Sequence, residues 1–154
     1  MRTPDRNVVD PIPGMAALVV KDGVALGGLG DAARLTALGF VWTGLPHGVL
    51  TERQVNAALE AQLSGAARFL ATDHVELRRW LCDTGWLDRD GFGREYRRVA
   101  RGALPERLQA LGMALEAAFA DGAGAAFTNA RRSARAAERE ARRRAHDSAG
   151  SPAN

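Results

Sequence analysis

The chain has 154 residues, 46% of them apolar, a size and composition that favour one modest globular core with tails. Its single cysteine, Cys82, excludes an internal disulfide and a thiolate zinc cage, and its three histidines match no metal-binding spacing. No segment approaches the roughly 20 apolar residues of a membrane span, and the start does not resemble a signal peptide. We therefore expect a cytoplasmic protein that does not enter a membrane.

The first half of the chain predicts an arm, a hairpin, a helix and a strand in that order. Residues 1–14 contain three prolines and little periodicity, which indicates a flexible arm. An Asp-Gly pair separates two short apolar runs in residues 15–29 and predicts a hairpin. Asp31 is expected to cap a helix that runs to about Trp42. Val49-Leu50 suits a short strand.

Two capped helices follow. Thr51 and Gln54 form a capping-box pattern, in which the hydroxyl caps a free backbone N–H and the amide reaches back to the cap. Residues 66–72 then connect to a second helix, with a Phe-Leu pair as a hydrophobic plug. Asp73 caps this second helix, and Gly85 ends it because glycine accepts a positive φ at little cost.

The remaining sequence predicts a hairpin and further helices. Residues 86–98 contain an Asp-Gly turn between two short segments, with Leu87 and Tyr96 expected inward and the arginines outward. Pro105 suits the first turn of a helix with an apolar stripe. Residues 128–145 indicate an exposed or frayed helix, and 148–154 disorder. The chain thus divides into a flexible arm (1–14), a winged-helix-like domain (15–101), a C-terminal helix (102–121) and a basic helical or disordered tail (122–154).

The order helix, strand, helix, turn, helix, hairpin is that of a winged helix-turn-helix. We therefore predict an α+β, mainly helical fold with a C-terminal helical extension, in which residues 73–84 form the recognition helix and 86–98 the wing. An α-helix fits the DNA major groove, and arginine can bind guanine there with two hydrogen bonds. The candidate nucleic-acid-binding residues are His74, Arg78, Arg79, Arg89, Arg94, Arg97, Arg98, Arg131, Arg132 and Arg135.

Charge distribution supports this hypothesis only in part. The net charge is +3, and seven arginines against two glutamates lie between residues 131 and 144. Such a basic arm suits phosphate contacts, although a solvated tail is at least as simple an explanation in a chain with one lysine. Residues 51–98 are neutral, and Asp83 is placed to pair with Arg79. Winged-helix order also serves protein–protein contacts, which keeps a second hypothesis open.

Three sequence blocks carry a family resemblance. Thr51-Glu52-Arg53-Gln54-Val55-Asn56-Ala57-Ala58-Leu59 is similar to the "Thr-Glu-x-x-Val-Asn-x-x-Leu" start of one bacterial family of unknown function, DUF2087. The second block, Asp73-His74-x-x-Leu77-Arg78-Arg79-x-Leu81-x-Asp83-x-Gly85, resembles a later element of this family. The third, Leu87-x-Arg89 followed by Gly93-Arg94-Glu95-Tyr96-Arg97-Arg98, resembles its closing segment, so the resemblance covers about residues 35–99. Departures are Cys82 and Trp86, where we expect aliphatic residues, and a longer 60–72 connection. The resemblance implies a transcription-regulator context and no catalytic residues; Asn56 would either buttress the helix junction or contact a ligand.

Enzyme signatures are weak. Gly27–Gly30 lacks the strand–helix context and spacing of a phosphate-binding loop, and no serine or threonine lies in a nucleophile elbow. Asp88 and Asp90 suit a turn. We therefore expect no catalytic, cofactor or metal site. The first hypothesis is a regulator that binds duplex DNA, with residues 104–145 available for dimerisation; the alternative is an adaptor that binds a protein partner through the apolar 104–120 stripe.

Overall fold

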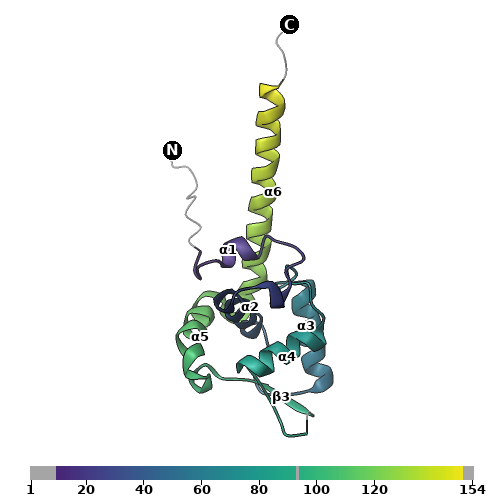
Figure 1. Cartoon of the computed structure of the whole chain (residues 1–154), viewed down its shortest axis with the longest axis vertical. Helices are drawn as coiled ribbons and strands as arrows, with labels where there is room; N and C mark the ends of the chain where they lie inside the picture. The colour runs from purple at the N-terminus through teal and green to yellow at the C-terminus, as the bar shows by residue number, and fades with distance from the viewer. Residues whose placement is uncertain (1–9, 93, 151–154) are drawn as a thin grey trace.

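The computed structural model describes residues 10–92 and 94–150 (Figure 1). The fold is mainly helical with one small antiparallel sheet, which confirms the predicted α+β class. The helices are α1 (Met15–Leu18), α2 (Asp31–Thr43), α3 (Glu52–Ser64), α4 (His74–Thr84), α5 (Glu106–Phe119) and α6 (Ala123–Ala149), and the strands are β1 (Val49–Thr51), β2 (Leu87–Arg89) and β3 (Glu95–Arg98). The predicted order of elements from α2 to β3 is present. No helix in the described part of the chain is long and apolar enough to cross a membrane.

The core is built around the second half of α2. Trp42 and Trp86 are fully buried, with their ring centroids 5.0 Å apart. The Trp42 indole donates a hydrogen bond to the Val99 carbonyl at 2.9 Å, which ties α2 to the end of the hairpin. Gly39 permits this close packing, because a Cβ there would lie 2.4 Å from the Leu115 Cδ1 atom on α5. The core therefore joins α2, the hairpin and α5 into one unit.

Both predicted helix starts are confirmed. The Gln54 backbone N–H donates to the Thr51 hydroxyl at 3.1 Å, and the Thr51 N–H donates to the Gln54 side chain at 2.9 Å. Asp73 accepts the backbone N–H of Glu76 at 2.8 Å. Gly85 ends α4 with φ 101°, a conformation that side-chain-bearing residues rarely adopt. These caps fix where α3 and α4 begin and where α4 turns into the hairpin.

The three strands lie in the order β1–β3–β2, both pairs antiparallel. Tyr96 is paired with Leu50 on one side and with Arg89 on the other. Along β3 the side chains alternate, so that Tyr96 and Arg98 are buried while Glu95 and Arg97 are exposed. The expectation that all hairpin arginines point outward is therefore wrong for Arg98.

Two predictions for the N-terminal region are also wrong. Residues 15–29 form α1 and a 3-10 turn instead of a hairpin, because Met15, Leu18 and Val19 are buried at helical spacing. Val24 instead pairs with the 66–72 connection, donating its N–H to the Phe69 carbonyl at 2.9 Å. Asp31 lies inside α2, whose N-cap is Gly30, and its side chain pairs with the arginine one turn later.

The C-terminal helices differ in their environment. The apolar stripe of α5 packs into the core, with Leu108, Leu115 and Phe119 buried. At the base of α6, the Thr128 hydroxyl donates to the Ala66 carbonyl at 2.7 Å. Beyond this anchor α6 projects away from the domain, at the end opposite the β2–β3 hairpin (Figure 1). Ser148, expected to be disordered, lies within the helix, and residues 151–154 and most of the predicted arm lie outside the described residues.

Candidate nucleic-acid interface

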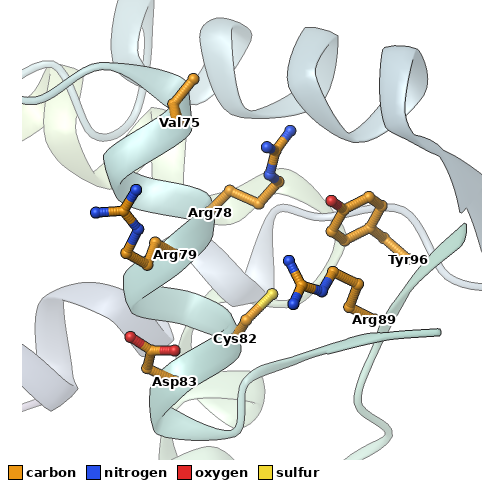
Figure 2. A pocket seen from close by; sticks show the side chains of 7 residues that line it. All are labelled: Val75, Arg78, Arg79, Cys82, Asp83, Arg89 and Tyr96. Carbon is orange, nitrogen blue, oxygen red and sulfur yellow. The ribbon is translucent and has the colours of Figure 1, made fainter. Parts of the chain in front are cut away.

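A hollow of about 340 Å³ separates α4 from the hairpin, and we call it the α4–hairpin hollow (Figure 2). Because successive turns of α4 present residues three or four apart to the hairpin, one side of the helix supplies most of the lining. Arginines outnumber acidic residues three to one in its lining. Its lining residues are Val75, Arg78, Arg79, Cys82, Asp83, Arg89 and Tyr96.

Arg78 is held firmly at the edge of this hollow. Its Nη1 donates to the Asn56 amide oxygen at 2.6 Å and to Glu52 Oε1 at 3.3 Å, both on α3. Its guanidinium also lies 5.3 Å from the centre of the Tyr96 ring. With 17% of its side chain exposed, Arg78 joins α3, α4 and β3. Asn56 thus buttresses the helix junction, one of the two roles open to it from the sequence.

Arg79 and Arg89 are the two arginines of the hollow whose positive charge is not paired with another side chain in the described structure. Both are exposed, and neither forms an ion pair or side-chain hydrogen bond with any residue the structure describes. Figure 2 shows Arg89 extending from β2 into the space beside α4, while Arg79 lies on the outer side of the helix. The anticipated pairing of Arg79 with Asp83 is not formed. These two guanidiniums are free to bind an external anion.

The other hairpin arginines divide between surface and core. Arg94 and Arg97 are exposed, and Arg97 lies opposite Asp88 in the strand register. Arg98 is only 6% exposed and donates from Nη1 to the carbonyls of Thr43 at 3.2 Å and Leu45 at 2.9 Å. Arg98 is therefore removed from the candidate set, because its guanidinium faces the core.

The buried position of Arg98 has an electrostatic consequence. Burial lowers the pKa of its guanidinium, while Glu116, 3.7 Å away, acts in the opposite direction. The charged group also lies 4.4 Å from the centre of the Trp42 ring. Arg98 thus joins β3, α2 and α5 from inside, which is a structural task.

The remaining predicted residues lie away from the hollow. His74 pairs with Glu60 on α3 at 3.2 Å and lines a separate depression between α3 and α4. On α6, Arg132 donates to the carbonyls of Val19 at 3.0 Å and Lys21 at 2.8 Å. Its neighbours Arg131 and Arg135 are half-buried and exposed respectively. Because α6 projects from the far end of the molecule, these three arginines do not share a surface with the hairpin (Figure 1).

Four lining residues were not among the sequence candidates, namely Val75, Cys82, Asp83 and Tyr96. Tyr96 was expected only as a core residue, yet it also closes one side of the hollow. Helical spacing could have identified Val75 and Cys82 as lining residues, because they lie one turn before and one turn after Arg78 and Arg79 on α4. Burial raises the pKa of the Cys82 thiol, while the positive charges of Arg89 and Arg78 act in the opposite direction. The thiol is therefore a neutral part of the lining.

Comparison with known proteins gave one match, which covers the central part of the chain. Searches of curated proteins and of solved structures gave no match. The model of one family, DUF2087, described as an uncharacterized protein conserved in bacteria, matches residues 30–98. The match begins at the N-cap of α2 and ends with the last residue of β3, so it covers the unit that forms the sheet and the α4–hairpin hollow. Residues 30–98 therefore match the DUF2087 family model, in agreement with the resemblance of the three sequence blocks.

Proposed function

We propose that this chain binds duplex DNA through the outer side of α4 and the β2–β3 hairpin. The observation that carries the proposal is the α4–hairpin hollow, where two uncommitted guanidiniums stand beside the fixed Arg78. An α-helix of 10–12 Å diameter fits the major groove, which is about 12 Å wide. In this arrangement Arg79 faces the groove and Arg89 contacts a phosphate from the face of the hairpin that carries Tyr96, while Arg97 contacts another phosphate from the opposite, exposed face.

The expected binding is weak and dependent on salt. Acidic residues around the same surface, among them Asp83 and Asp88, limit its net positive charge. Each phosphate neutralised by an arginine contributes about −0.9 to the slope of log affinity against log salt. Three contacts from Arg79, Arg89 and Arg97 therefore predict a slope contribution of roughly −3.

Fluorescence anisotropy with a random-sequence duplex tests the proposal. At about 50 mM salt, where non-specific binding is strong, the full chain should bind. The R79Q/R89Q/R97Q variant should reduce the magnitude of the salt slope by roughly 3. A matched pair of single variants, R89Q and R101Q, separates position from charge: both remove one exposed arginine, but Arg101 does not line the hollow.

Two outcomes overturn the proposal. Absence of any affinity for the duplex at low salt would exclude nucleic-acid binding by the whole chain. Unchanged binding by the triple variant, or equal effects of R89Q and R101Q, would exclude the α4–hairpin surface. The adaptor alternative has less support, since the α5 stripe on which it depended is packed into the core at Leu108, Leu115 and Phe119.

A further inference from the structure

The part of α6 that leaves the domain is a solvent-exposed helix with an uneven charge distribution. Every residue from Ser133 to Ala149 is exposed. Arg135, Arg139, Arg142 and His146 recur at intervals of four, three and four residues, which places them on one side of the helix. At about 1.5 Å per residue this line extends roughly 16 Å. We call it the α6 arginine stripe.

No ion pair within the described residues neutralises the stripe, and its charge is offset only in part by Glu138, which lies three residues after Arg135 and four before Arg142. Within residues 10–92 and 94–150, Arg135, Arg139 and Arg142 have no ion-pair partner. Glu140 instead pairs with Arg143 at 3.4 Å and with Arg144 at 3.3 Å, on a different side of the helix. Three like charges one turn apart repel each other, so the exposed helix gains from an external anion.

The base of α6 is fixed, so the stripe has a defined position relative to the domain. Arg68 donates to the Asn129 side chain at 2.9 Å, and Arg132 bonds to two carbonyls of the segment after α1. Figure 1 shows the helix continuing from this base away from the sheet. The stripe and the α4–hairpin hollow are consequently separate surfaces at opposite ends of the molecule.

We propose that the α6 arginine stripe is a second nucleic-acid-binding surface, which contacts the phosphate backbone of a duplex without reading its bases. The charge complementarity is direct, because guanidinium is well suited to phosphate. A membrane surface fits poorly: the residues from 128 to 149 include no leucine, phenylalanine or tryptophan that could enter the lipid. The proposal does not rest on the α4–hairpin surface binding DNA, since the two sets of arginines are independent.

The test uses the full chain and compares two arrangements of the same residues. R135Q/R139Q/R142Q removes the stripe and should reduce the magnitude of the salt slope for a random duplex by roughly 2 to 3. A permuted variant, R135A/R139A/R142A/A136R/A137R/A145R, keeps the composition but directs the three arginines to three different sides of α6. It should also lose most of this contribution, because the charges no longer face one duplex together.

Both variants are measured in the wild-type chain and in the R79Q/R89Q/R97Q chain, so that failure at one surface is not confused with failure at the other. Circular dichroism checks that α6 remains helical. Binding by the permuted variant equal to that of wild type would show that net charge alone acts, and would overturn the stripe. Unchanged binding by R135Q/R139Q/R142Q would overturn it as well. Tighter binding to anionic phospholipid vesicles than to the duplex would replace nucleic acid with a lipid surface.

Discussion

The inner and outer sides of the β2–β3 hairpin use arginine in opposite ways. Arg97 and Arg98 are adjacent on β3, yet Arg97 is exposed and Arg98 is enclosed by α2 and α5. A similar contrast occurs on α4, where Arg78 is bonded to α3 and Arg79 has no partner in the described structure. Neighbouring arginines therefore divide into one that holds the fold together and one that is available to an external ligand.

The division follows from backbone geometry. Side chains alternate along a strand, so adjacent residues of β3 must face opposite sides. Adjacent residues on a helix are rotated by about 100°, which turns Arg79 away from the α3 carboxylate and amide that hold Arg78. Removal of each arginine should therefore affect either stability or binding, and the predictions below compare these effects.

The largest effect is expected at Arg98. An Arg98→Met substitution removes the donor to the Thr43 and Leu45 carbonyls and leaves Glu116 without its partner. Loss of one partner from a buried charged network costs roughly 3 kcal/mol or more of unfolding free energy. Urea denaturation followed by circular dichroism measures this change.

The control for this prediction is Arg97→Met, one residue away. Its side chain is exposed on the outer side of β3, and exposed substitutions usually change stability by less than about 0.5 kcal/mol. Similar losses for the two variants would contradict the inner-and-outer division, because they would show that strand position does not separate the roles.

Local signals made the order of elements predictable from the sequence. Thr51, Gln54 and Asp73 satisfy backbone N–H groups through their own side chains, and Gly85 accepts a positive φ. Such interactions span a few residues, so the sequence contains all of their parts. The starts of α3 and α4, the end of α4 and the hairpin after it could be predicted for this reason.

The composition of the site could not be predicted to the same extent. The tasks of Arg78 and Arg98 depend on partners 22 and 53 residues away, Asn56 and Leu45, and spacing along one element does not identify them. The prediction of a hairpin in residues 15–29 was wrong for the same reason. Val24 pairs with the backbone of the 66–72 connection, so its apolar run did not need a hairpin partner nearby.

An intermediate effect on the free energy of unfolding is expected at Asn56, the neutral side chain that accepts a hydrogen bond from the half-buried Arg78. Asn56→Ala removes the amide oxygen that accepts the Arg78 Nη1 hydrogen bond at 2.6 Å. A hydrogen bond to a charged group contributes about 1.5 kcal/mol, and a loss of this size should appear in urea denaturation. Asn129→Ala is the matched control, because Asn129 accepts from Arg68 at an exposed position and should contribute less. Equal losses would show that the Arg78 junction is no more important than a surface contact.

The smallest effect on stability, and the clearest effect on binding, is expected at Arg79. Arg79→Met should leave the unfolding free energy within about 0.5 kcal/mol of wild type, because arginine and methionine have similar helix propensities and no described residue pairs with this guanidinium. If Arg79 contacts DNA as proposed, the same variant reduces the magnitude of the salt slope by about 1. Urea denaturation and fluorescence anisotropy on one preparation measure both quantities. A destabilisation above about 1 kcal/mol would assign Arg79 to the fold, whereas loss of affinity at constant stability would place it on the outer, ligand-facing side.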